Sequence, residues 1–185
     1  MREIIPRQTL LFLFFLLLCS PTFLIKDYCY SIERDSAQIK NIQDFIGLPR
    51  RVMGQTRESV IEKLGLPHKS EATKIKNLHV ENVYDIYQCF YYEGIQVVIF
   101  RSGYEKDREF LSAVTLQKNT DLFDLPIRIG DSASDVKRLL GEPDRLDKHR
   151  LVYLDLYSEG PGSDSIDFFF EGETVKQIQW QYFLD

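Results

Sequence analysis

Apolar side chains recur at helical spacing in two stretches of the chain, residues 56–64 and 132–140. In each stretch they form a single stripe, which is typical of a short helix that packs one face against a core. The stripes consist of Val60, Ile61 and Leu64 in the first stretch and of Val136, Leu139 and Leu140 in the second. Each stretch opens on a residue type that caps helices and is followed by glycine. The pattern predicts two short helices that face a core.

The two predicted helices lie in a sequence phrase that occurs twice. Residues 54–67 align without gaps on residues 130–143, so that each position of the first copy recurs 76 positions later. Self-similarity at a fixed spacing indicates that one folding unit is used twice. We therefore predict two modules, residues 49–124 and residues 125–185.

After each predicted helix, apolar and polar residues alternate with the period of two that is typical of strands. The expected strands cover residues 83–92, 95–101 and 111–117 in the first module and 152–156, 166–170 and 177–182 in the second. The stretches 68–82 and 144–150 are expected to be loops. Consecutive strands joined by short turns pair antiparallel. The sequence thus predicts an α+β fold of two tandem modules, each a helix plus a three-stranded antiparallel meander. Their strands form a continuous or side-by-side sheet with the helices on one face.

The alternation also assigns side chains to the two faces of the predicted sheet. If Val152, Leu154 and Leu156 face the core, the tyrosines between them point away from it. In the last strand Trp180 takes the core side, which leaves the glutamines outward. The resulting surface consists of Tyr153, Tyr157, Gln177, Gln179 and Gln181, with Tyr87 and Tyr91 from the first module. Tyrosine is enriched at interfaces, so this surface is our candidate for protein binding. The alternative is a solvated face whose cross-strand pairs only stabilise the strands.

The N-terminal residues 1–31 have the pattern of an export signal. Arg2 and Arg7 precede an uninterrupted apolar run, residues 10–18. A retained membrane anchor is the alternative, although the apolar stretch 9–25 is slightly short for a span. We expect the protein to be exported and to be periplasmic, secreted or anchored to the membrane by this segment. Residues 32–48 are expected to form a short amphipathic helix that docks on the first module or acts as a tether.

The repeated phrase resembles a known family. The pattern Ile127-Arg128-Ile129-Gly130-Asp-Ser-x-x-Asp-Val136-x-x-x-Leu140-Gly141-x-Pro143, followed by an aromatic strand, is similar to that of the SmpA/OmlA-type outer-membrane assembly lipoproteins. With two modules in tandem, the chain resembles the secreted β-lactamase inhibitor proteins over about residues 50–185. The resemblance implies a role in the cell envelope in assembly or in inhibition.

The cysteines fit this resemblance only in part. A lipoprotein would carry its lipid on a cysteine such as Cys19, but Leu18 precedes it where a small residue is required, so we expect no lipidation. Cys29 and Cys89 could form one bridge. The inhibitor proteins carry a disulfide in each repeat, and this chain lacks the cysteines for that.

Composition narrows the functional classes. Hydrophobic residues make up 44% of the chain, which suffices for a core without disulfides. The formal net charge is −5, and it becomes −6 without residues 1–31, which hold three basic and two acidic residues. This balance argues against binding to nucleic acid, which depends on Lys and Arg contacts to phosphate.

Catalytic motifs are absent from the sequence, since it contains no G-x-S-x-G, no phosphate-binding glycine loop and no H-E-x-x-H. Ser163 and the polar group Asp144, Asp147 and His149 are interpreted as loop residues. We therefore predict no enzyme activity, no metal and no cofactor. The first hypothesis is an exported, non-enzymatic envelope protein that binds another protein through the open sheet face, as a scaffold or assembly accessory. The alternative is a secreted inhibitor that plugs an enzyme with a loop such as residues 102–109.

Overall fold

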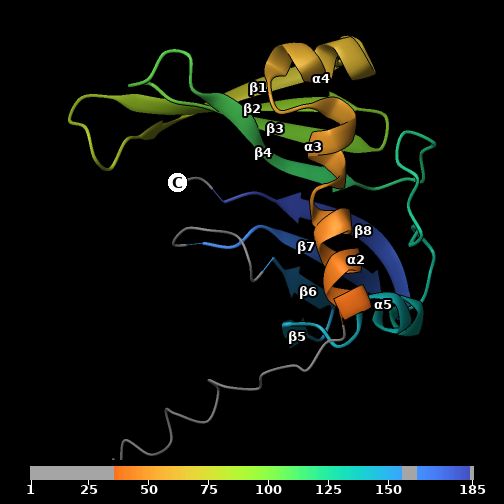
Figure 1. Cartoon of the computed structure of the whole chain (residues 1–185). Coiled ribbons are helices and arrows are strands. Elements are labelled where there is room, and N and C mark those ends of the chain that lie inside the picture. The colour runs from red at the N-terminus through yellow and green to blue at the C-terminus, as the bar shows by residue number, and fades with distance from the viewer. Residues whose placement is uncertain (1–35, 156–161, 184–185) are drawn as a thin grey trace, which may run out of the picture. The chain divides into compact units, whose positions relative to one another are not determined.

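Eight antiparallel strands form a single sheet in the order β1-β2-β3-β4-β8-β7-β6-β5 (Figure 1). The computed structural model describes residues 36–155 and 162–183. Four helices accompany the sheet in this part of the chain, so the fold is α+β, as predicted. The strands are β1 (Lys69–Lys76), β2 (Tyr84–Tyr92), β3 (Ile95–Arg101), β4 (Glu109–Leu116), β5 (Arg145–Asp147), β6 (Arg150–Leu154), β7 (Ser165–Glu171) and β8 (Thr174–Gln181).

The two edge strands, β1 and β5, lie in stretches that the sequence predicts as loops. All eight residues of β1 and all three of β5 are exposed. A strand with no buried side shows no apolar alternation, so its sequence gives no strand signal. The other six strands are present where expected, but β6 spans 150–154 rather than 152–156.

Helices α4 (Arg57–Leu64) and α5 (Ala133–Leu140) confirm the two predicted helices. Each begins with a capping box, in which the N-cap side chain and the third helical residue exchange hydrogen bonds with each other's backbone N–H. The N-cap residues are Thr56 and Ser132. Gly65 and Gly141 follow the helices, both with φ of 79°, a conformation that favours glycine. The hydrogen bonds from Ser132 also hold the pKa of the Asp135 carboxyl below its usual range.

Replacing Ser132 by alanine is expected to lower the free energy of unfolding by about 1 kcal/mol, because the backbone N–H of Asp135 loses its cap acceptor. Ser132→Asp retains an acceptor at this position and should lose much less. Urea denaturation followed by circular dichroism measures both variants. Equal losses in the two variants would contradict a capping role for Ser132.

Helices α2 (Ser36–Ile46) and α3 (Leu48–Met53) precede the first repeated phrase. The predicted amphipathic helix is thus present, and it buries Ile42, Phe45 and Ile46. However, α2 contacts α5 and β7 of the second module, and Phe45 packs edge-on against Phe168 at 6.3 Å. The sequence suggests docking on the first module or a tether, and the structure adds these contacts with residues 125–185, which the sequence does not predict.

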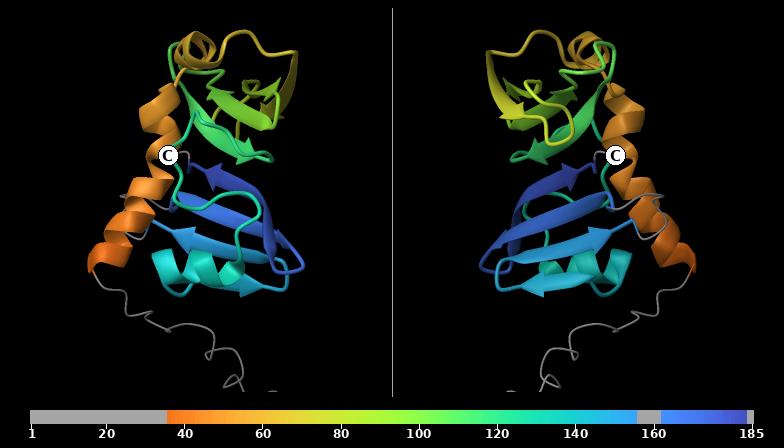
Figure 2. Two further views of the ribbon diagram at one scale, coloured as in Figure 1. Left: turned by 90° about the vertical axis from the view of Figure 1, so that its right-hand side faces the viewer. Right: turned by 90° about the vertical axis from the view of Figure 1, so that its left-hand side faces the viewer.

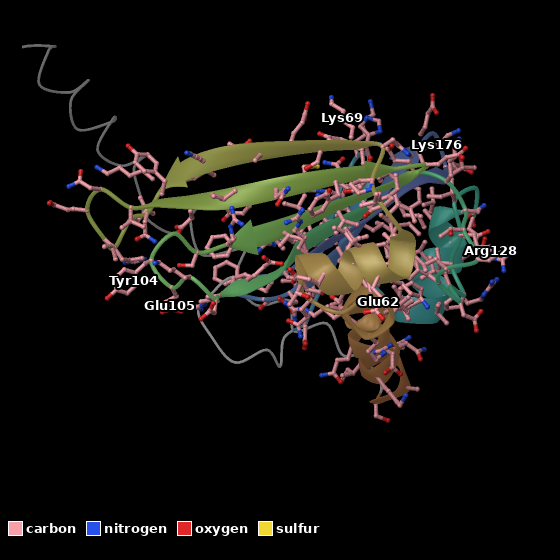
Figure 3. The ribbon with its side chains drawn as sticks, turned by 90° about the horizontal axis from the view of Figure 1, so that it is seen from above. Glu62, Lys69, Tyr104, Glu105, Arg128 and Lys176 are labelled. Atoms are coloured by element: carbon pink, nitrogen blue, oxygen red, sulfur yellow. The ribbon has the colours of Figure 1, made fainter. Side chains whose placement is uncertain are left out.

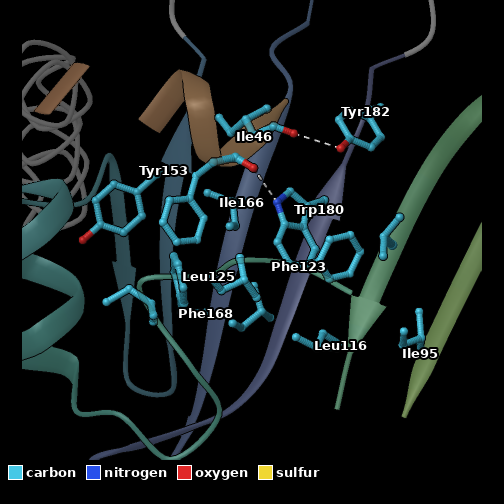
Figure 4. Packing of buried hydrophobic residues seen from close by; sticks show 14 of the residues in the cluster. Ile46, Ile95, Leu116, Phe123, Leu125, Tyr153, Ile166, Phe168, Trp180 and Tyr182 are labelled. Atoms are coloured by element: carbon cyan, nitrogen blue, oxygen red, sulfur yellow. Dashed lines mark hydrogen bonds between the residues drawn. The ribbon is translucent and has the colours of Figure 1, made fainter. Parts of the chain in front are cut away.

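The end of α2 is completed by side chains of β8 and the residues after it (Figure 4). Pro49 has no backbone N–H, so the carbonyl of Phe45, four residues earlier, lacks its helical donor. The indole Nε1 of Trp180 donates to this carbonyl at 2.9 Å. The Tyr182 hydroxyl donates to the carbonyl of Ile46, also at 2.9 Å. Both hydrogen bonds are buried, and they join residues about three quarters of the chain apart.

The core lies on one face of the sheet, and Tyr153 belongs to it. In the register, Tyr153 is paired with Ile166, and Ile166 with Trp180. All three are fully buried. The prediction that Tyr153 points to solvent while Val152 and Leu154 face the core is therefore wrong. The segment 151–154 has large apolar side chains at every position, so its alternation does not distinguish the faces.

Several predictions fall on residues outside the described ranges. These are the signal peptide or anchor at residues 1–31, Cys19, Cys29, Leu156 and Tyr157. Cys89 is a free, half-buried thiol. Among residues 36–155 and 162–183, no helix is long and apolar enough to cross a membrane.

Candidate protein-binding face

The side chains that alternate with the core residues form the opposite surface of the sheet, here called the open face. Helices α2 and α3 run together along one side of the sheet (Figure 2). One row of the open face can be followed across six strands through the strand register. It consists of Tyr91, Gln96, Thr115, Gln179, Asp167 and Val152. The row joins the two predicted modules without interruption.

Five of the seven predicted site residues lie on the open face, but they do not form one cluster. Gln177 and Gln179 are half-buried and Gln181 is exposed, all on β8. Tyr87 and Tyr91 are half-buried on β2. Since β3 and β4 separate β2 from β8, the two groups are about 14 Å apart at the usual strand spacing. The glutamines thus lie at the centre of the face, and the tyrosines lie towards the β1 edge.

Tyr91 is held by its neighbours on the open face. Its hydroxyl donates to Glu71 Oε2 at 2.8 Å, and Lys69 Nζ lies 5.2 Å from the centre of its ring. Hydrogen bonding to Cys89 and Glu71 raises the pKa of the Tyr91 hydroxyl. The ring is therefore fixed in place before any partner binds, which lowers the entropic cost of contact.

An aromatic row at one end of the open face escaped the sequence-based prediction. Tyr87 lies edge-on to Phe100, with ring centres 5.3 Å apart, and Phe100 stacks on Phe110 at 4.8 Å. Burial raises the pKa of the Tyr87 hydroxyl. The sequence gives one signal for this row, which is that Phe100 and Phe110 flank the charged stretch 102–109.

The aromatic row forms part of a cavity of about 490 Å³ between the β1–β2 and β3–β4 connections. We call it the hairpin pocket. Asp85 joins the two connections, because its carboxylate accepts from Asn77 Nδ2 at 2.9 Å and from the Gly103 backbone N–H at 3.0 Å. A side chain at Gly103 would collide with the Tyr84 carbonyl. The apolar and aromatic lining consists of Ile75, Leu78, Val80, Tyr87, Phe100, Tyr104 and Phe110.

Exposed apolar side chains gather around the hairpin pocket. Of the seven large apolar residues that are exposed in the described part of the chain, four lie on the strand ends and connections at this end of the sheet. They are Ile75, Leu78, Tyr84 and Tyr104. Tyr104 and Glu105 lie at the tip of the β3–β4 connection (Figure 3). Exposed apolar clusters of this kind mark interaction sites more often than isolated residues do.

A polar cluster occupies the second half of the open face. The side chain of Asp167 is only 4% exposed, and its carboxylate lies 3.4 Å from Arg150 Nη1 and 3.3 Å from Ser165 Oγ. Burial raises the pKa of the Asp167 carboxyl, and the charge of Arg150 acts in the opposite direction. The cluster borders a cavity of about 410 Å³. Ser165 has an acidic hydrogen-bond partner in Asp167, and Asp167 has a basic partner in Arg150, which is the composition of a structural ion pair.

Among the residues that the structure describes, no group of three or more His, Cys, Asp and Glu side chains is arranged to hold a metal ion. The polar residues Asp144, Asp147 and His149 make local contacts instead. The Asp144 carboxylate accepts from the backbone N–H of Leu154, and the Asp147 carboxylate accepts from that of His149. This backbone contact lowers the pKa of the Asp147 carboxyl.

Comparisons of the chain with models of protein families, with curated proteins and with solved structures found no match.

Proposed function

We propose that this chain is a non-enzymatic, exported cell-envelope protein that binds another protein through the open face, as a scaffold or assembly accessory. The observation that carries the proposal is the gathering of exposed apolar residues at one end of the sheet, around the hairpin pocket. Pre-positioned aromatic rings continue the apolar surface inward from this end. Aromatic side chains that are rigid before binding contribute strongly to protein interfaces.

We further propose that residues 49–124 and 125–185 are two copies of one module, with the helices on one face of the shared sheet. The strand register supports this. Thr115 of β4 and Gln179 of β8 are paired where the two halves of the sheet meet. Going outward from this pair, strand by strand, the residues in register on one side have counterparts at the same places on the other side. They are Gln96, Tyr91 and Lys69 on one side and Asp167, Val152 and Arg145 on the other. Lys69 and Arg145 are separated by the same 76 positions as the repeated phrase. A two-fold axis perpendicular to the sheet would produce this pattern.

The placement of the helices on one face is supported by their buried residues. Phe45 of α2, Val60 of α4 and Val136 of α5 all belong to one hydrophobic cluster with the core side of the sheet. The part of the open face around Tyr91 and Gln179 would then be left for a partner, whereas Val152 and Asp167 at its other end are buried. Export through residues 1–31 is supported by the sequence pattern alone, and cell fractionation with and without this segment tests it.

Site-specific photo-crosslinking tests the binding face. In the full chain produced in its native cells, a benzophenone amino acid at Gln179 should yield a covalent adduct with a partner protein, because Gln179 lies at the centre of the open face. The same group at Glu62, which is exposed on α4 (Figure 3), is the matched control and should yield none. Adducts at Glu62 but not at Gln179 would place the binding surface elsewhere.

Inhibition of an enzyme is the second candidate function, because the β3–β4 connection presents Tyr104 with 64% of its surface exposed. A protruding aromatic residue of this kind can enter an active site. In that case a crosslinker at Tyr104 should capture an enzyme whose activity falls when this protein is added. A captured protein that keeps full activity would favour the scaffold function.

A further inference from the structure

Strand β1 is a long, exposed edge of the sheet, without a neighbour on its outer side among the described strands. It is the first strand in the sheet order, and all eight of its residues are exposed. The opposite edge, β5, has only three residues. Figure 3 shows β1 at the margin of the sheet, with Lys69 at its start. An edge of this length can hydrogen-bond to an added strand along its outer side.

One hydrogen bond shows which backbone N–H and C=O groups of β1 point away from β2. Asn77, just after β1, donates its backbone N–H to the Val83 carbonyl at 2.9 Å. In an antiparallel ladder, the hydrogen bonds to the neighbouring strand come from alternate residues. The register of β1 with β2 is continuous from Lys69 to Lys76, so the odd-numbered residues bond to β2. The N–H and C=O groups of Ser70, Ala72, Lys74 and Lys76 therefore point outward.

The two sides of β1 differ in chemistry. Lys74 and Lys76 lie on one side, and within the described residues neither is in an ion pair. Thr73 and Ile75 lie on the other side, that of the open face, because their register partners are Tyr87 and Asp85. Ile75 is 49% exposed and lines the hairpin pocket. Towards its C-terminal end, the edge thus carries two lysines on one side and Ile75 on the other, whereas Lys69 and Glu71 share the side of Ile75 nearer its start.

We propose that β1 binds an extended acidic segment of a partner protein as a ninth strand. In this segment, acidic residues alternate with apolar ones. The acidic side chains meet Lys74 and Lys76, and the apolar side chain beside Ile75 enters the hairpin pocket. Backbone hydrogen bonds provide the affinity and the alternating side chains provide the specificity, as in other cases of strand addition.

This site does not depend on the proposed function of the central open face, since it uses the β1 edge and its own side chains. Lysines on an edge strand also protect against pairing with a second copy. That role explains Lys74 and Lys76, because a second copy paired in antiparallel fashion about residue 75 would bring lysines together. It does not explain the exposed Ile75 and Leu78, which would favour such pairing. An acidic partner strand with alternating apolar residues would account for both the lysines and the exposed apolar side chains.

The side-chain part of the proposal is tested with a fluorescein-labelled peptide of sequence Gly-Glu-Phe-Glu-Val-Glu-Gly, titrated with the purified full chain and followed by anisotropy. A peptide with lysine in place of glutamate should bind about tenfold more weakly, since each exposed charge pair changes from attraction to repulsion. The double substitution Lys74→Glu with Lys76→Glu should reverse this preference. The matched control is Lys63→Glu with Lys148→Glu, which changes the net charge equally at exposed lysines outside β1 and should keep the preference.

The backbone part is tested with two methylated versions of the same acidic peptide. In each version, the alternate backbone nitrogens along one edge of the extended peptide are methylated, and the two versions differ in which edge this is. One version should lose binding, because strand addition needs these N–H groups. Hydrogen exchange of the Ala72 and Lys74 amides should slow when unmethylated peptide saturates the protein. Circular dichroism establishes that each variant is folded. The proposal is wrong if both methylated versions bind as well as the parent, if no peptide binds, or if the control lysines change the preference as much as Lys74 and Lys76 do.

Discussion

Replacing Trp180 by alanine is expected to lower the free energy of unfolding by about 3–5 kcal/mol, the usual range for loss of a large buried aromatic side chain. Trp180 is fully buried and packs against Phe123, with ring centres 5.7 Å apart. The substitution leaves a cavity and also removes the donor to the Phe45 carbonyl. Trp180 is the only tryptophan of the chain, so unfolding should be followed by circular dichroism.

A double-mutant cycle separates the hydrogen bond of Trp180 from its packing. Trp180→Phe keeps most of the ring but leaves the Phe45 carbonyl buried without a donor, which costs about 1–3 kcal/mol. Pro49→Ala restores a backbone N–H four residues after Phe45. We expect Pro49→Ala to be more favourable in the Trp180→Phe background than in the native chain. Strictly additive effects would show that Trp180 does not substitute for the helical donor.

Tyr153→Ala is also expected to cost about 3–5 kcal/mol of unfolding free energy, because Tyr153 is fully buried. Its ring lies edge-on to Phe168 at 6.0 Å, and its hydroxyl donates to the carbonyl of Gly141 at 2.9 Å, which fixes the end of α5 against β6. Tyr153→Phe should lose only about 1 kcal/mol of unfolding free energy, because it removes the hydrogen bond to Gly141 but keeps the ring.

Tyr91→Ala is the matched control for Tyr153. Its hydroxyl also has a partner, Glu71, but it lies on the open face, and we expect a loss below about 1 kcal/mol. Guanidinium denaturation of the three variants measures the differences. Similar losses for Tyr91→Ala and Tyr153→Ala would contradict the assignment of the two faces.

The sequence predicts the elements whose signals are local. The helices α4 and α5 are recognised from Thr56, Ser132 and the glycines that follow them, because a cap is a contact between neighbours in sequence. The central strands are recognised because each buries one side. Strand β1 has no buried residue, so only its pairing with β2 defines it, and no pattern within residues 69–76 contains that information.

In the candidate site, too, the residues with a local sequence signal can be predicted, and those that depend on distant contacts cannot. The face on which the glutamines of β8 lie can be predicted, because Ile178 and Trp180 alternate with them without ambiguity. Tyr153 was misplaced, since tyrosine is buried readily when its hydroxyl finds a partner, here a carbonyl twelve residues earlier. The stacking of Phe100 on Phe110 depends on an irregularity in the register at Val98 and Ile99, which is visible only in the paired strands.

The hydrogen bonds that complete α2 also constrain the order in which the molecule can fold. The donors, Trp180 and Tyr182, are among the last residues of the sequence, whereas the acceptors lie near residue 45. β8 is also the strand that joins the two halves of the sheet, through its pairing with β4. The core therefore cannot close before β8 has been synthesised, because contacts so distant in sequence form only when both segments are present.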